Sequence, residues 1–295
     1  MSYQFRIEQT NRSLRFPAMM MAAIVASVVA AYAFVACGDR SPDQAAAGEP
    51  VSAVTPTTTP TAAAPVETPA LVISGPVSFE MADSAYRGRR YDDATALFRA
   101  YTETRPSNAF GFYMLGLSAW KSGDRATAES AFLQAIDLDS THVKSRLNLS
   151  RVLLEGAQPE SALVHIDAAI ALDSTSSEPL RLQGRAFEAQ GKFEDAIVAY
   201  RRAIELDDTD VWAFNNLGAL YIRLGQFQDA IEPLTSAVKL NDKVATFHNN
   251  LGMAFERTGR YRAAESEYRA ALAIEGTYGK AVANLQRVEQ LKETP

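Results

Sequence analysis

Six alanines recur at an unbroken interval of 34 residues along this chain, at Ala94, Ala128, Ala162, Ala196, Ala230 and Ala264. If each alanine is numbered as position 20 of a 34-residue frame, position 8 holds a small residue in every frame, and position 24 holds an aromatic or large aliphatic one. Such a period is typical of proteins in which each repeat buries its apolar face against the next repeat. The chain is therefore predicted to form a solenoid rather than a domain around a single core.

Each frame contains two amphipathic stretches with the period of an α-helix, separated by a glycine such as Gly191 or Gly225. The small residue at position 8 indicates that the two helices of a frame cross closely there, and the large residue at position 24 is expected to fill the gap to the following repeat. We therefore expect an all-α fold in which helix pairs stack.

This pattern resembles the tetratricopeptide repeat (TPR). The resemblance rests on a Leu-Gly pair in the first helix, as in Leu217-Gly218, on a Gly-x-aromatic turn, as in Gly225-Gln-Phe227, and on the alanines of the second helix. It covers residues 75 to about 291 and implies an α-α superhelical solenoid of six TPR units with a C-terminal capping helix. The units are 75–108, 109–142, 143–176, 177–210, 211–244 and 245–278, and the cap is 279–291.

Residues 1–37 have the composition of a membrane-targeting segment. Three arginines precede an uncharged run from Ala18 to Ala36, and Cys37, the only cysteine, follows the run. This order predicts that the rest of the chain faces away from the cytoplasm. The string Phe34-Val35-Ala36-Cys37 resembles the lipobox of bacterial lipoproteins, which implies lipid attachment at Cys37. The alternatives are an uncleaved signal anchor, because the apolar run is about long enough to span a bilayer, and a conventional cleaved signal peptide.

Residues 38–76 are rich in Pro, Thr and Ala, a composition that cannot form a core and favours a disordered linker. The sequence therefore predicts a membrane-targeting helix, a linker, and a TPR domain over residues 77–291. We expect the protein to lie in a bacterial cell envelope, anchored in a membrane, with the repeats on the periplasmic side.

The repeat region shows no pattern typical of an enzyme. Its histidines, His142, His165 and His248, fall at unrelated positions of different frames, without cysteine or carboxylate neighbours at a metal-ligand spacing. There is no phosphate-binding loop and no nucleophile motif. The formal net charge of −6 argues against nucleic acid as a partner. We expect no catalysis, no cofactor, no metal and no small-molecule substrate.

The TPR resemblance implies a concave binding groove lined by positions 2, 6, 9 and 13 of the first helices. Nine of these residues are basic and four are acidic, which gives the groove a charge of +5. An acidic or extended partner is therefore expected, the alternative being a chance bias on a solvated face. The acidic residues are Glu80, Asp83, Glu155 and Glu178, and the basic ones are Arg87, Lys121, Lys144, Arg151, Arg185, Arg223, Arg257, Lys280 and Arg287.

Position 6 repeats asparagine, at Asn148, Asn216, Asn250 and Asn284. An amide both donates and accepts hydrogen bonds, so a row of amides can hold the backbone of an extended peptide. The row is similar to the asparagine ladder in the repeats of O-linked N-acetylglucosamine transferases, although asparagine is also common here in TPR sequences. Trp212, at position 2, is a candidate aromatic anchor, the alternative being packing between repeats.

These observations predict an envelope-tethered TPR scaffold that binds a protein or peptide in its groove and mediates complex assembly. One alternative is a lipoprotein that resembles the pilotins, which assist pilus secretin assembly. Another is a structural module that self-associates through its convex face.

Overall fold

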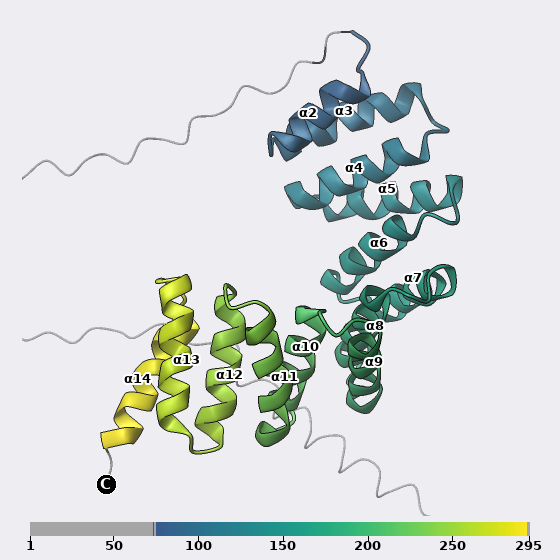
Figure 1. Cartoon of the computed structure of the whole chain (residues 1–295). Helices are drawn as coiled ribbons and strands as arrows, with labels where there is room; N and C mark the ends of the chain where they lie inside the picture. The colour runs from purple at the N-terminus through teal and green to yellow at the C-terminus, as the bar shows by residue number, and fades with distance from the viewer. Residues whose placement is uncertain (1–72, 74, 294–295) are drawn as a thin grey trace, which may run out of the picture. The chain divides into compact units, whose positions relative to one another are not determined.

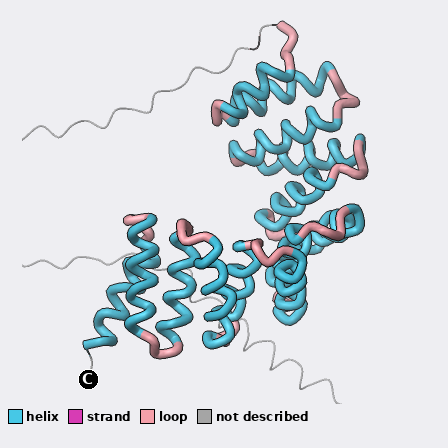
Figure 2. Tube along the Cα trace, viewed as in Figure 1, coloured by secondary structure: helices cyan, strands magenta, loops and turns pink. Residues whose placement is uncertain are grey.

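The computed structural model of the protein describes residue 73 and residues 75–293, so Cys37, the targeting segment and nearly all of the predicted linker lie outside the described residues. Within the described part the regular structure is helical, with no strand (Figure 2). The helices are α2 (Phe79–Arg87), α3 (Tyr91–Thr104), α4 (Ala109–Ser122), α5 (Arg125–Leu138), α6 (Val143–Glu155), α7 (Pro159–Leu172), α8 (Ser177–Ala189), α9 (Phe193–Leu206), α10 (Val211–Arg223), α11 (Phe227–Leu240), α12 (Ala245–Arg257), α13 (Tyr261–Ile274) and α14 (Gly279–Glu293).

The helices form six antiparallel pairs, from α2/α3 to α12/α13, and α14 follows the last pair (Figure 1). The second helix of each pair packs on its own first helix and on the first helix of the next pair. Successive first helices, from α4 to α14, also contact one another, whereas successive second helices do not pack to that extent in the described part. The first helices therefore form the inner layer. The predicted all-α solenoid of six pairs with a capping helix is confirmed.

Position 8 is small because the second helix of the same pair leaves no room for a side chain. A Cβ on Gly184 would lie 2.5 Å from Cε1 of Tyr200, and a Cβ on Gly116 would lie 2.6 Å from Cδ1 of Phe132. Both rings occupy position 24 and are fully buried. The close crossing predicted at position 8 is therefore confirmed. The expectation for position 24 was incomplete, because its side chain lies first of all against the small residue of its own repeat.

The turn inside each pair contains one residue in the left-handed region, at position 15 of the frame. Glycine provides it in four pairs, for example Gly191 with φ 75° and Gly225 with φ 76°. In the other two pairs, Arg89 with φ 59° and Ala157 with φ 56° take the same conformation. A Cβ makes this region unfavourable for these residues by about 1–2 kcal/mol.

Three loops between pairs share an Asp-x-Thr turn that was not singled out in the sequence. After α7, Oδ1 of Asp173 accepts hydrogen bonds from the backbone N–H of Thr175 at 3.0 Å and from its hydroxyl at 2.7 Å. The turn recurs at Asp139–Thr141 and Asp207–Thr209. These hydrogen bonds, the threonine side chain's first, lower the pKa of each aspartate.

Position 4 holds polar residues in two first helices, where they make hydrogen bonds to the preceding loop. The Arg146 guanidinium donates to the carbonyl oxygen of Ser140, with Nη2 at 2.8 Å. Nε2 of His248 lies 3.1 Å from the carbonyl oxygen of Asp242, and Nδ1 lies 2.7 Å from Oε2 of Glu267. Both residues therefore fasten a first helix to the loop that leads into it.

Candidate functional site

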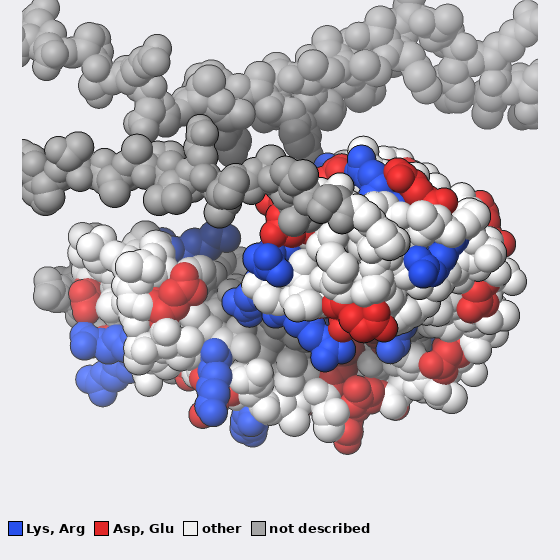
Figure 3. Space-filling view, turned by 90° about the horizontal axis from the view of Figure 1, so that it is seen from above, with Lys and Arg blue, Asp and Glu red and all other residues white. Residues whose placement is uncertain are grey.

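The candidate site is the inner face of the first helices, from α2 to α14, which we call the first-helix face. Basic side chains border the hollow of this domain on both sides in Figure 3, with acidic side chains among them. Many of the predicted basic residues are paired with carboxylates on the same face. The ion pairs are Arg87–Asp83 at 2.7 Å, Arg223–Glu188 at 3.1 Å, Arg287–Glu256 at 2.6 Å, and Arg151–Glu178.

Two of these carboxylates, Glu188 and Glu256, occupy position 12, which the sequence-based count of groove residues omitted. Each accepts a hydrogen bond from a buried tyrosine of its own pair, Tyr200 at 3.1 Å and Tyr268 at 2.7 Å. Burial, followed by the nearby carboxylate, raises the pKa of both tyrosines. Acidic groups therefore also occur in the C-terminal half of the face, so its positive charge is smaller than the +5 counted from the sequence.

Three arginines come together at the centre of the face, on α6 and α8. Burial and then the neighbouring guanidiniums of Arg181 and Arg185 lower the pKa of Arg151. Arg181, at position 5, was missed in the sequence; its Nε donates to Oδ2 of Asp210 at 3.0 Å. Arg185 makes no hydrogen bond or ion pair with another described residue. It is the basic group of this cluster that is available to a partner.

The asparagines of position 6 are largely used inside the protein. Nδ2 of Asn250 donates to Oδ1 of Asn215 at 2.9 Å, and Nδ2 of Asn284 donates to Oδ1 of Asn249 at 2.9 Å. These two bonds fasten α10 to α12 and α12 to α14. The signal for them is the Asn-Asn pair at positions 5 and 6, which the sequence analysis read only as single asparagines.

The two other asparagines of position 6 differ in their environment. Asn148 is buried and accepts a hydrogen bond from Arg151. Asn250 and Asn284 donate to an asparagine at position 5 of the preceding first helix, but for Asn216 that position, on α8, is Arg181. The Nδ2 group of Asn216 therefore has no acceptor among the described residues. The role predicted for this row, holding a peptide backbone, therefore stays a prediction chiefly for Asn216.

Trp212 is 47% exposed at position 2 of α10, and its ring meets Phe247 edge-on, with 5.0 Å between centroids. It thus packs between repeats on one edge and offers its remaining surface to a partner. Lys144 and Lys280, also at position 2, are exposed and form no ion pair in the described part of the chain.

On the first-helix side, a pocket of about 420 Å³ lies at the C-terminal ends of α10 and α12. Arg223, Arg257 and Arg287 line it together with Phe227 and Met253. The structure therefore brings together three basic residues that the sequence placed in separate repeats.

Arg257 differs from its two neighbours in this pocket. Its guanidinium lies 4.4 Å from the ring centroid of Phe227, and no carboxylate pairs with it among the described residues. One repeat earlier, Arg223 takes the same place over Phe193 and pairs with Glu188. The residue that corresponds to Glu188 for Arg257 is Ile222, which also lines the pocket. Arg257 thus presents unpaired N–H donors where an equivalent site holds a carboxylate.

Glu256 fixes the capping helix beside this pocket. Burial alone would raise the pKa of its carboxyl, but hydrogen bonds from Arg287 and Tyr268 outweigh burial and lower the pKa. Nε and Nη2 of Arg287 both reach the carboxylate, at 2.6 and 2.8 Å. Such a bidentate pair is directional, so Arg287 holds α14 and is not free for a ligand.

In residues 73 and 75–293, no helix is long and apolar enough to cross a membrane. The same residues contain no group of three or more His, Cys, Asp or Glu side chains placed to hold a metal ion.

Family models locate the repeats directly. A model described as tetratricopeptide repeat matches residues 113–177 and 215–280, and a model described as TPR repeat matches residues 184–225. The chain is a tetratricopeptide repeat protein. A search of curated protein sequences gives no match. The TPR architecture is that of a protein-binding scaffold, and TPR proteins are in general not catalytic.

Several solved TPR structures are similar to this one. PilW, described as a widely conserved type IV pilus biogenesis factor, is 20% identical with a TM-score of 0.62, over 71% of this chain and 96% of that one. The APC/C hetero-tetramer Cut9-Hcn1 is 18% identical with a TM-score of 0.61, over 70% of this chain and 41% of that one. A thermophilic TPR protein of Thermus thermophilus is 18% identical with a TM-score of 0.53, over 62% of this chain and all of that one. At these identities the likeness shows the TPR fold alone.

Proposed function

We propose that the protein is an envelope-tethered TPR scaffold that holds an extended segment of a partner protein on its first-helix face and so mediates complex assembly. The tether is the N-terminal segment, whose apolar run and Cys37 motif support a membrane anchor. The repeats supply a face with unpaired basic and amide groups. The partner segment carries carboxylates, from acidic side chains or a chain end.

The observation that carries this proposal is the unpaired Arg257 in the pocket between α10 and α12. Its guanidinium is oriented by stacking on Phe227, and Ile222 stands where the preceding repeat has a carboxylate. A carboxylate from a partner would complete the pattern that Arg223 and Glu188 already form. Hydrogen bonds between a guanidinium and a carboxylate are among the strong ones, and stacking lowers the cost of fixing the arginine.

The other unpaired groups lie on successive first helices, with Lys144 on α6, Arg185 on α8, and Asn216 with Trp212 on α10. Packed helices are about 8–10 Å apart, so the distance from α6 to α12 is roughly 25–30 Å. An extended chain rises about 3.3 Å per residue and would cover this distance with about eight or nine residues. A short extended segment therefore suits the available groups.

The face used for binding can be tested by photo-crosslinking in cells. A photoreactive phenylalanine analogue is placed at Trp212 on the first-helix face and, as the matched control, at Val164 on α7, which is 66% exposed and belongs to no described pocket. We expect one distinct crosslinked protein from position 212 and none from position 164. Crosslinking only from position 164 would place the partner on the outer layer and contradict the proposal.

The chemistry can be tested with the recovered partner, titrated against variants at two salt concentrations. Arg257→Gln should weaken binding about tenfold, since a charge-assisted hydrogen bond contributes about 1.5–3 kcal/mol. Arg262→Gln is the control, because Arg262 is exposed on α13 and makes no described ion pair. Equal affinities for the two variants would refute the role of Arg257. A pilus secretin as the recovered partner would favour the pilotin-like alternative, and a second copy of this chain would favour self-association.

A further inference from the structure

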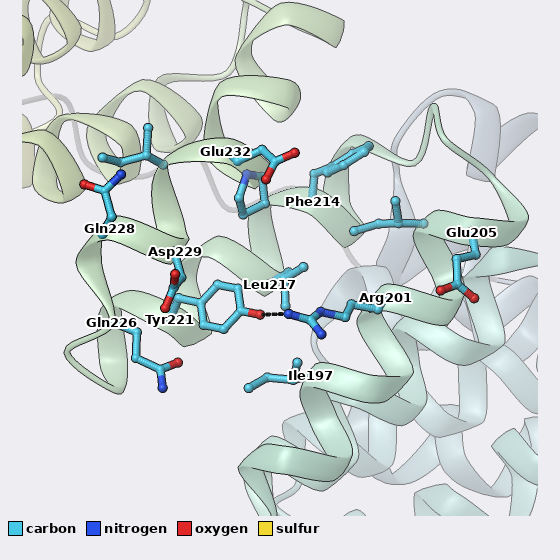
Figure 4. Close-up of a pocket in the computed structure, with 13 residues that line it drawn as sticks. Ile197, Arg201, Glu205, Phe214, Leu217, Tyr221, Gln226, Gln228, Asp229 and Glu232 are labelled. Atoms are coloured by element: carbon cyan, nitrogen blue, oxygen red, sulfur yellow. Dashed lines mark hydrogen bonds between the residues drawn. The ribbon is translucent and has the colours of Figure 1, made fainter.

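A cavity of about 930 Å³ lies not on the first-helix face but between α9 and α11 in the outer layer (Figure 4). Ile197, Arg201, Ile204 and Glu205 line it from one stripe of α9. Phe214, Leu217 and Tyr221 line it from α10, and the remaining lining residues belong to the turn before α11 and to its first half. We call this cavity the α9–α11 cleft.

The floor of the cleft is apolar and incompletely covered. Ile197, Ile204 and Ile231 are only partly buried, although they pack against the core. On α11 only Ile231 adds a large aliphatic side chain to this lining, and the other lining residues of α11 are Gln228, Asp229, Glu232 and Pro233. Ile197 and Ile204 of α9 therefore face mostly polar side chains across the cleft, and they keep surface that a ligand can bury.

The rim of the cleft contains acceptors of hydrogen bonds but few free donors. Glu205, Asp229 and Glu232 are exposed, and none of the three forms an ion pair with another described residue. The one basic group, Arg201, donates from Nη2 to the Tyr221 hydroxyl at 2.7 Å (Figure 4). Three carboxylates against one occupied guanidinium give this rim a negative charge.

Pro233 interrupts the backbone hydrogen bonds of α11 beside the cleft. It stands inside α11, where its nitrogen carries no hydrogen. The carbonyl oxygen of Asp229, four residues earlier, therefore receives no helical hydrogen bond from position 233. Asp229 and Pro233 both line the cleft. The α9–α11 cleft thus combines aliphatic surface with carboxylates, which suit a ligand that brings aliphatic side chains and N–H donors.

We propose that the α9–α11 cleft is a second docking site, which takes an amphipathic segment of a partner protein that carries lysine or arginine beside aliphatic side chains. The basic groups would lie among Glu205, Asp229 and Glu232, and the aliphatic ones would cover Ile197 and Ile204. This site is separate from the first-helix face and has the opposite charge. The scaffold would then hold an acidic segment on its inner layer and a basic segment on its outer layer.

The composition of the chain argues for a partner rather than for its own linker as the occupant. Residues 38–76 lie close to the repeat domain in sequence, but between Ser41 and Pro76 they contain no lysine and no arginine. The acidic residues between Ser41 and Pro76, which are Asp43, Glu49 and Glu67, would be repelled by the carboxylates of the rim. Electrostatic complementarity thus selects a basic segment from another protein.

The probe for this site is a fluorescein-labelled peptide of about twelve residues, with leucine and lysine in helical spacing. Its binding to the full-length protein in mild detergent is measured by fluorescence anisotropy. Two control peptides carry glutamate in place of lysine or serine in place of leucine. The test variant is Asp229→Asn with Glu232→Gln, and the matched control is Asp195→Asn with Glu194→Gln, which changes the charge equally at exposed positions of α9 outside the cleft.

We expect the leucine–lysine peptide to bind the unchanged protein and both control peptides to bind much more weakly. The cleft variant should weaken binding about three- to tenfold, as the loss of two exposed ion pairs implies, and the control variant by less than about twofold. Equal weakening by the two variants would show attraction by net charge alone and overturn the proposal. Light scattering would overturn it as well if the unchanged protein were a dimer and the cleft variant a monomer, because the occupant would then be a second copy.

Discussion

Two glycines of the same helix pair, Gly218 and Gly225, should respond to alanine for different physical reasons. Gly218 lies inside α10, where a Cβ would stand 2.8 Å from Cδ2 of Leu234 and closer still to its branch carbon. Carbon atoms in contact are normally about 3.5–4.0 Å apart, and Leu234 is fully buried. The α10 and α11 backbones must therefore separate to admit the methyl group.

Gly218→Ala would stabilise an isolated helix by about 1 kcal/mol, because alanine has the higher helix propensity. Overpacking of a core costs about 1–3 kcal/mol, and here the blocking atom is a branch carbon rather than a flexible chain end. We expect a net loss of about 1–2 kcal/mol in the free energy of unfolding. Gly225→Ala meets nothing within 4 Å, so only its φ of 76° matters. The left-handed conformation costs about 1–2 kcal/mol, offset by about 0.4–1 kcal/mol of unfolded-state entropy, and we expect a smaller loss of about 0.5–1 kcal/mol.

Urea unfolding of each variant, combined with a double-mutant cycle, distinguishes the two causes. Leu234→Ala removes the atoms that block Gly218, so Gly218→Ala should become neutral or stabilising in that background, whereas Gly225→Ala should keep its cost. Ala157→Gly is the reverse case and should stabilise by about 0.5–1 kcal/mol, because Ala157 already has φ 56°. The reasoning fails if Gly218→Ala stabilises the unchanged protein, or if its effect simply adds to that of Leu234→Ala.

Three further predictions concern other parts of the chain. Hydrogen bonds from Thr175 lower the pKa of Asp173 in the folded state, so their stabilisation is full above the unfolded pKa and is lost as pH falls through the folded one. Thr175→Val should therefore lower the melting temperature more at about pH 7 than at about pH 2, and an equal loss at both would contradict this. His248→Phe leaves the partly buried carboxylate of Glu267 without its partner and should destabilise by about 1–3 kcal/mol in urea unfolding, a cost that Glu267→Gln should reduce. Cys37→Ser should abolish labelling by a fatty-acid analogue and leave an uncleaved precursor; label that persists would place the lipid elsewhere.

The fold was predictable because the same pattern of small and large residues recurs in six consecutive 34-residue frames. A small residue at position 8 indicates a close crossing of the two helices of a repeat, and all six frames have one there. Gly184, which packs against the ring of Tyr200, is an example. Details that break the period were harder to predict. Arg89 and Ala157 take the left-handed conformation at position 15, where four repeats have glycine, whereas in these two repeats the glycine, Gly88 or Gly156, stands one position earlier. The two hydrogen bonds of His248 likewise depend on Asp242 and Glu267, which lie in another loop and another helix.

The candidate site was predictable as a face but not in its detail. The TPR resemblance assigned Arg223 and Arg257 to one side of their helices, and both line one pocket. The sequence could not show that Glu188 pairs with Arg223, or that Arg257 has no carboxylate partner among the described residues. Such pairing depends on how far long side chains reach from one repeat to the next. The four asparagines of position 6 likewise looked equivalent in the sequence. They differ in the structure because the residue at position 5 of the preceding first helix is an asparagine, which can accept their hydrogen bond, only for Asn250 and Asn284.

The asparagine bonds between α10, α12 and α14 bear on binding even though they take amides away from a partner. Asn250 fastens α12 to Asn215, and Asn284 fastens α14 to Asn249, while Arg287 holds α14 to Glu256. These contacts fix the spacing of the first helices that surround Arg257. A site whose groups are already in position loses less conformational entropy when a partner binds. Breaking one bond by Asn249→Leu, whose hydrogen bonds involve none of the groups proposed to hold the partner, should therefore weaken binding at Arg257 by a few-fold in the same titration. Unchanged affinity would mean that the first-helix face is equally ordered without this bond.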